Sequence, residues 1–418
     1  MGPRPSLAHL LVPYVIARTE VRQMTRTPCE LPRLAFVSNA SLAILLTLQK
    51  ENCMRSQRKD LFTKRNLSTA FVGATLIATP LVNVFAADVN LPPVSVGAGV
   101  RTSFAHTDPD VGEDAADFAL NSARIYISGK ATESISLMFN TEYSSVDEDV
   151  TVIDAVAQFS FSDQFNVWAG RFLPPSDRAN LYGPYYANHW GVYTDGIQDG
   201  YPFETTGRAD GLMYWGQFGI AKVSLGAFDI ANVIDEPTTG DSDVLVAGRV
   251  QLDFWDAEAG YYLNGTYYGA KDLLAVGVAA QTADGDNAYS VDFLLEKKLG
   301  NDGVVSLEAE YAWYDGLGGY PPPTSFGYEE TGGAYVLGAY LFPQVVGIGK
   351  FQVLGKFAQA TYENSLTGDV DQDTTEINVN YIIKDFNARI SLFYIDVSFD
   401  PVTGGDASQI GLGLQVQI

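Results

Sequence analysis

The chain has little cysteine, little histidine and few basic residues. Its 418 residues include 2 Cys, 3 His and 26 Lys+Arg, against 50 Asp+Glu. Both cysteines, Cys29 and Cys53, lie in an N-terminal part that we expect to be absent from the mature protein. Neither a disulfide nor a cysteine–metal site is therefore predicted to hold that protein together. The formal net charge of −24 disfavours nucleic acid as a partner. No cofactor is indicated.

Residues 54–86 have the features of a secretory signal peptide. A basic region is followed by an uncharged apolar run, Leu67–Phe85, and by small residues before Ala87. Met54 makes a natural start, so residues 1–53 are predicted to be a misassigned or dispensable extension; a real N-terminal anchor is the alternative. Residues 1–86 hold 11 of the 26 basic and 4 of the 50 acidic residues, which leaves 15 and 46 in residues 87–418.

Residues 87–418 also lack any apolar run long enough for a membrane helix. They show period-two alternation instead, most clearly at the end of the chain. There, Ile410, Leu412, Leu414, Val416 and Ile418 alternate with glycine and glutamine. An unpaired strand of this kind would recruit other strands, and a barrel avoids this by pairing the last strand with the first. Because only helices and closed barrels satisfy the backbone in lipid, we predict an all-β transmembrane antiparallel β-barrel of the bacterial outer membrane in residues 87–418.

Sixteen alternating segments of about ten residues, separated by turn-rich linkers, support this architecture. The segments are Val94–Phe104, Ala123–Gly129, Ile135–Tyr143, Ile153–Phe161, Asn166–Phe172, Gly211–Trp215, Ala221–Asp229, Val244–Phe254, Leu274–Thr282, Ala288–Glu296, Val304–Tyr314, Tyr335–Phe342, Phe351–Thr361, Thr375–Ile383, Ala388–Val397 and Gln409–Ile418. A seventeenth candidate, Gly260–Tyr267, alternates least cleanly. Since single-chain bacterial barrels have an even number of strands, we assign it to a long turn on the inner side.

The linkers alternate between short turns and longer acidic loops. The loops are predicted at 108–117, 144–152, 235–243 and 369–373. Short turns inside and long loops outside are typical of outer-membrane barrels. We interpret the acidic loops as a solvated outer surface. No metal site is predicted, because the 369–373 loop lacks the central Gly and closing Glu of a calcium hand.

Charged residues on the predicted strands fall opposite the apolar face, toward the lumen. Arg or Lys at the lipid midplane costs roughly 2–4 kcal/mol, so inward placement is strongly favoured. The lumen-lining candidates are Arg101, Arg124, Lys222, Arg249, Lys350, Lys356, Glu142, Asp154, Glu308 and Glu310. They either select ions or keep the lumen wet while pairing with one another.

The longest linker spans residues 173–208 and is rich in Tyr, Gly, Asn and Asp. Unstructured loops of this length are usually functional. If it folds inward and narrows the pore, the constriction candidates are Arg171, Arg178 and Arg208. The alternative is a loop packed outward at a subunit interface.

Three stretches are informative: Asp154-Ala155-Val156 through Asn166–Phe172 to Pro174, the segment Leu273–Gly277, and the turn Lys297–Gly303 with the strand that follows. Together they resemble the phosphate-selective porin O and P family. The resemblance implies a trimeric, sixteen-stranded porin that passes anions through an arginine-lined constriction fed by a lysine ladder. The sequence departs from that pattern in having no dense lysine run in any loop.

The leading functional hypothesis is an outer-membrane porin for passive diffusion of ions and small hydrophilic solutes, with phosphate or other anions as candidates. The alternative is a closed structural or adhesive barrel that acts through its acidic loops. An enzyme is not expected and no catalytic residue is assigned. Residues 87–418 contain two histidines, His106 and His189, and no Gly-x-Ser-x-Gly element. The expected partners are outer-membrane lipid, small ions or solutes, and two further copies in a homotrimer.

Overall fold

The computed structural model describes residues 93–144, 149–192, 194–197, 207–230, 243–283, 285–315, 330–363, 368–401 and 405–418. The predicted extension 1–53, the predicted signal peptide 54–86 and most of the predicted loop 235–243 lie outside the described residues. No helix within these ranges combines the length and the apolar character needed to span a membrane.

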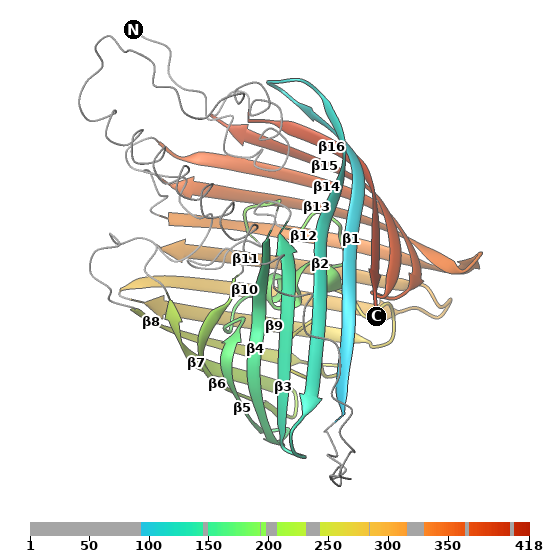
Figure 1. The fold of residues 1–418 in the computed structure, drawn as a ribbon. Coiled ribbons are helices and arrows are strands. Elements are labelled where there is room, and N and C mark those ends of the chain that lie inside the picture. The colour runs from blue at the N-terminus through green and yellow to red at the C-terminus, as the bar shows by residue number, and fades with distance from the viewer. Residues whose placement is uncertain are drawn as a thin grey trace, which may run out of the picture. The chain divides into compact units, whose positions relative to one another are not determined.

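The described residues form a closed barrel of sixteen antiparallel strands, each paired with its neighbours in sequence. The first and last strands close it, with a register that runs from Gly99 opposite Gln417 to Pro109 opposite Ala407. Figure 1 shows β1 lying beside β16. The strands are β1 Val94–Pro109, β2 Ala115–Lys130, β3 Ile135–Ser144, β4 Asp149–Ser162, β5 Phe165–Phe172, β6 Ala209–Phe218, β7 Ala221–Ile230, β8 Asp243–Asp253, β9 Leu273–Ala283, β10 Asp286–Lys298, β11 Val304–Asp315, β12 Glu330–Val346, β13 Gly349–Glu363, β14 Val370–Lys384, β15 Ala388–Asp400 and β16 Ala407–Gln417.

The period-two pattern sorts the side chains between lipid and lumen. Outward residues such as Val278, Leu392 and Leu412 are about half exposed, at 51%, 49% and 54%. Their neighbours along each strand are buried on the inner face. An apolar outer band around a polar interior is what a membrane barrel requires. The prediction of sixteen strands is confirmed, and residues 260–267 form no strand.

Aromatic pairs lie on the outer face near both ends of the barrel. Phe104 and Phe118 contact each other near the loop ends of β1 and β2, with ring centroids 4.7 Å apart. Near the turn that joins β4 to β5, Phe165 contacts Phe161 at 5.7 Å and Tyr214 at 5.6 Å. Such girdles mark the two membrane interfaces.

Three predicted loops are partly strand in the structure. β1 continues to Pro109, β4 begins at Asp149 and β14 begins at Val370. The predicted loop 369–373 is therefore wrong beyond its first residue. Asp371 accepts a hydrogen bond from Thr361 Oγ1 at 2.7 Å, and Asp373 accepts one from Gln359 Nε2 at 2.8 Å. These cross-strand pairs extend the ladder through a stretch too polar to be recognised as a membrane strand.

The connection between β5 and β6 contains α2, Arg178–Tyr186. Asp177 caps its N-terminus by accepting a hydrogen bond from the Asn180 backbone N at 2.8 Å. A kink occurs at Gly183, whose φ is 60°, next to Pro184. The predicted 173–208 loop thus holds a short helix. Hydrogen bonds and an ion pair with inward side chains of the wall place residues 173–192 and 194–197 inside the barrel.

Candidate functional site in the barrel lumen

Basic residues of the barrel wall hold the loop backbone. Arg389 on β15 is fully buried. Its Nη1 donates to the carbonyl oxygens of Ala187 at 2.7 Å and Asn188 at 3.2 Å. Its Nη2 donates to the carbonyl oxygen of His189 at 3.3 Å. A guanidinium has five donors in a fixed fork, so one side chain can hold three successive carbonyls.

On the opposite part of the wall, strands β8 and β9 hold the start of the loop. Arg249 Nη1 donates to the carbonyl oxygen of Ser176 at 3.1 Å, and Gln281 Nε2 donates to that of Pro175 at 2.9 Å. Arg249 also forms a bidentate ion pair with Asp292 of β10. The lumen charges here bind the loop and each other rather than face open water.

Trp190 anchors the far end of the loop. Its backbone N donates to Glu376 Oε1 and Asn378 Oδ1, each at 2.9 Å. Its ring stacks on Phe393, with centroids 5.6 Å apart and planes 12° apart. The Arg101 guanidinium lies 4.3 Å from the ring centroid, a cation–π contact.

Glycines on lumen faces mark where the loop touches the wall. A Cβ at Gly413 of β16 would lie 2.5 Å from the Trp190 ring. A Cβ at Gly99 of β1 would lie 2.6 Å from the Tyr185 ring. Neither contact is compatible with a larger residue, so glycine at these positions lets large aromatic rings approach the wall.

A buried basic–acidic contact fixes the loop beyond Trp190. Lys356 of β13 pairs with Asp195, and its Nζ lies 3.3 Å from His189 Nε2. The same ammonium lies 4.2 Å from the centroid of the Tyr335 ring. Arg101, Lys356 and Arg389 on one side of the barrel and Arg249 on the other therefore share one task, which is to keep the described residues of this loop in the lumen.

Buried carboxylates face the start of α2. Glu310 of β11 accepts a hydrogen bond from the Ala179 backbone N at 3.3 Å. Glu308 accepts one from Tyr335 Oη at 2.8 Å. Asp177 lies close to this cluster, and burial raises the pKa of its carboxyl to about 6, even though Asn180 donates two hydrogen bonds to it.

A second segment, residues 257–271 between β8 and β9, also enters the lumen. Leu263 N donates to the carbonyl oxygen of Leu181 at 3.3 Å, and Gly265 N donates to that of Tyr186 at 2.9 Å. Tyr261 Oη donates to the carbonyl oxygen of Leu173 at 2.8 Å. The two segments therefore pack as one body, which we call the plug (residues 173–192, 194–197 and 257–271).

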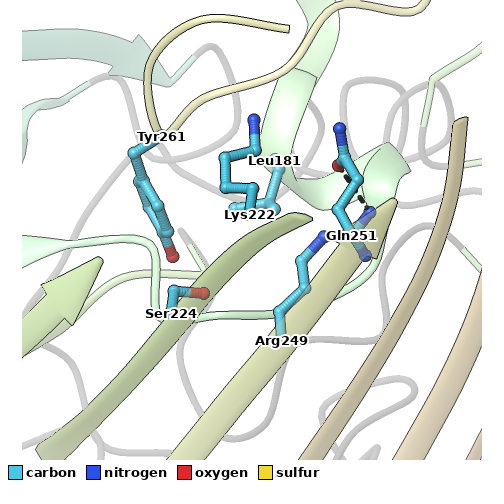
Figure 2. Close-up of a pocket in the computed structure, with 6 residues that line it drawn as sticks. All are labelled: Leu181, Lys222, Ser224, Arg249, Gln251 and Tyr261. Carbon is cyan, nitrogen blue, oxygen red and sulfur yellow. Dashed lines mark hydrogen bonds between the residues drawn. The ribbon is translucent and has the colours of Figure 1, made fainter. Parts of the chain in front are cut away.

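The contact between plug and wall leaves little space. A cavity of about 10 Å³ lies between Leu181 and Tyr261 of the plug and the β7 and β8 side chains. Figure 2 shows Lys222 and Ser224 from β7 with Arg249 and Gln251 from β8, and the 3.1 Å hydrogen bond from Arg249 to Gln251. Such a volume holds about one water molecule, so the plug and the wall are in close contact here.

Lumen-facing side chains of β2 and β3 remain accessible to solvent. Along the middle of β7 to β14, the described lumen-facing side chains are buried. On β2 and β3, Tyr126, Met138, Asn140 and Glu142 stay partly exposed. Glu142 keeps 21% of its side chain exposed while it pairs with Arg124 of β2, whose Nε lies 2.9 Å from Glu142 Oε2. We call Tyr126, Met138, Asn140 and Glu142 the β2–β3 face.

The three predicted constriction arginines have different positions. Arg178 is fully buried inside the plug. Arg208 lies on the lumen side, with its Nε 3.7 Å from Asp154 Oδ1. Arg171 is on the outer face of β5, where it alternates with the inward Trp168 and Phe172 and pairs with Asp210 at 3.1 Å. The structure therefore does not bring the three together.

The ten predicted lumen-lining residues lie on the inner face, with Lys350 at the turn end of β13. Only Glu142 and Lys350 of these keep intermediate exposure; the other eight are buried. The sequence reasoning missed Glu258, Trp190 and Arg389, which hold the plug. The lumen-facing glycines and the aromatic-rich 260–267 segment were the available signals.

No protein-family model matches the sequence, and no curated protein matches it. Solved structures do. OprB of Pseudomonas putida, in a high-pH structure, matches with a TM-score of 0.52 and 10% identity, over 78% of this chain and 94% of that one. OmpF of Salmonella typhi, in a complex with daunomycin, matches with a TM-score of 0.51 and 14% identity, over 78% and 98%.

The chain has the porin fold. With its apolar outer band and aromatic girdles, it is a transmembrane barrel of the bacterial outer membrane.

Proposed function

We propose that the protein is a porin through which ions and small hydrophilic solutes diffuse passively, along a path beside the β2–β3 face. The observation that carries this proposal is the partial exposure of Tyr126, Met138, Asn140 and Glu142, in contrast to the buried lumen-facing side chains along the middle of β7 to β14. Hydrophilic side chains along a narrow path favour small solvated solutes over apolar ones.

The charge along this path is mixed. Arg124 pairs with Glu142, and Arg208 lies near Asp154. Paired charges largely cancel at a distance, so the path is expected to discriminate weakly between cations and anions. The resemblance to the phosphate-selective porins is the ground for including phosphate and other anions among the permeants, and for a homotrimeric assembly.

The test is the reversal potential in a planar bilayer under a KCl gradient, with phosphate then added. A small reversal potential is expected. Anion preference with phosphate block, weakened in Arg124→Ala, would support phosphate passage. Chemical cross-linking in detergent followed by mass measurement tests the trimer.

One observation favours a second function. The plug fills so much of the lumen that a closed structural or adhesive barrel, acting through its acidic loops, also fits. Single-channel recording separates the two, because a closed barrel gives no conductance steps under any salt gradient.

A further inference from the structure

The β8–β9 connection departs from a simple turn. Hydrogen bonds between the two strands continue past their ends: Phe254 N donates to the carbonyl oxygen of Leu274 at 2.8 Å, and Asp256 N donates to that of Asp272 at 3.0 Å. A tight hairpin could therefore close the wall here, as a two-residue connection does between β12 and β13. Residues 257–271 are thus an insertion that the barrel wall does not need.

The insertion carries a buried acid into the lumen. Glu258 is fully buried and accepts hydrogen bonds from Arg178 Nη1 at 3.0 Å, Gln251 Nε2 at 2.7 Å and Tyr267 Oη at 3.0 Å. Lys222 Nζ donates to the backbone carbonyl oxygens of Glu258 and Gly260 at 2.9 and 3.0 Å. A buried carboxylate with this many partners is specifically positioned.

The other end of the insertion is held as firmly. Glu296 of β10 accepts hydrogen bonds from Thr266 Oγ1 at 2.6 Å, Tyr267 N at 2.9 Å and Gly269 N at 2.7 Å. Between these anchors, Arg178 Nη1 also donates to the carbonyl oxygen of Asn264 at 3.0 Å. The first residue of α2 is therefore tied to the insertion at two points.

We propose that residues 257–271 are a second constriction element, which enters from the turn side of the barrel and latches α2 in the lumen through the Arg178–Glu258 pair. In this arrangement Glu258 is a positioning residue. The insertion reaches the β2–β3 face through Asp154, which accepts hydrogen bonds from Tyr262 Oη at 3.0 Å and from Asn140 Nδ2 at 2.8 Å, and so it sets the width of the passage there. The inference rests on the proposed pore function.

Removing one partner of the Arg178–Glu258 pair should disturb the lumen more than removing both. Breaking a buried ion pair leaves an uncompensated charge in a site that excludes water, whereas replacing both partners with apolar residues of similar size is often neutral. Arg178 Nε also lies 3.5 Å from Asp292 Oδ1, and Asp292 keeps its bidentate partner Arg249 when Arg178 is lost. The double variant Arg178→Met/Glu258→Leu should therefore hold the plug where either single change does not.

The experiment is single-channel recording on the full chain. Glu258→Gln and Arg178→Met should each make steps to a higher conductance level more frequent, on the order of a hundredfold, and the double variant should return to wild-type behaviour. Glu133→Gln, on the exposed β2–β3 turn, is the matched control and should behave as wild type. A second variant replaces residues 257–271 with Asn-Gly in the Arg178→Met background. The replacement keeps the hydrogen-bond ladder between β8 and β9. This variant should conduct permanently at the higher level. Circular dichroism and heat-dependent gel migration check that each barrel is folded.

The outcomes separate this inference from the proposed function. If the wild type conducts and neither Glu258→Gln nor the replacement changes its conductance, the constriction element is refuted while the pore stands. If the wild type does not conduct and the replacement does, the insertion closes the pore completely, and passive diffusion through the wild type is refuted. If neither conducts, both proposals fail. Should one of the two variants not fold, the other decides by the same criteria.

Discussion

Acidification should tighten the plug through Asp177. This residue is 1% exposed, caps α2 and faces the carboxylates of Asp292 and Glu310 and the guanidinium of Arg249. Burial raises the pKa of its carboxyl to about 6, and the charge on Asp292 raises it further against the hydrogen bonds from Asn180. When the loop leaves the lumen, the carboxyl becomes solvated and its pKa returns to the ordinary value.

The pH dependence of loop docking follows from the raised pKa of Asp177. Because the pKa of Asp177 is higher in the docked loop, docking becomes more favourable as pH falls through 6. It becomes less favourable as pH rises through 6. Between pH 7.5 and 5.0 the gain is about 1.4 kcal/mol, roughly tenfold in the docking equilibrium. Glu258 does not oppose this. Burial disfavours its charge, but Arg178 and Lys222 outweigh burial and lower its pKa, so it stays ionised across this range.

The assay compares single-channel records at pH 7.5 and 5.0. In the wild type, steps to a higher conductance level should be about tenfold rarer at pH 5.0. Asp177→Asn keeps the helix cap and removes the charge, so its records should change less between the two pH values than those of the wild type. Asp163→Asn, in the exposed β4–β5 turn, should keep the wild-type response. If Asp177→Asn titrates as the wild type does, another group is responsible and the reasoning about Asp177 is refuted.

Three further predictions concern the wall. Arg171→Ala should leave conductance and selectivity unchanged in bilayer recordings, because its side chain points outward and pairs with Asp210; a shifted reversal potential would contradict this placement. Arg389→Ala removes the donor to three loop carbonyls and should raise amide hydrogen exchange at residues 187–191 by about tenfold or more, with unchanged exchange there as the contrary result. Val278→Lys, in the outer band, should lower the free energy of unfolding in lipid by roughly 2–4 kcal/mol, measured by urea titration, and a loss below 1 kcal/mol would place it outside the membrane.

The sequence predicted the barrel wall well because lipid penalises errors of register strongly. Each strand places every second side chain against hydrocarbon, so the alternation of Ile410, Leu412 and Leu414 with small or polar neighbours states which face is which. The strand ends were less predictable. Outside the lipid the outer face meets water, so a polar stretch such as 370–373 carries no contrast in sequence, although Asp371 and Asp373 are exposed and Gln372 is buried.

The plug depended on tertiary structure. Arg178 and Glu258 are 80 residues apart, and Arg389 is 202 residues from Ala187, so no local pattern links them. The β5 strand misled for a related reason. Its inner face carries Trp168 and Phe172, which pack on the plug and on each other, so both faces look apolar and the orientation of Arg171 is ambiguous in sequence. Alternation alone determined the barrel wall because the lipid around it is a uniform apolar solvent. The interior was decided by ion pairs and hydrogen bonds between distant residues, which form only once the barrel has closed.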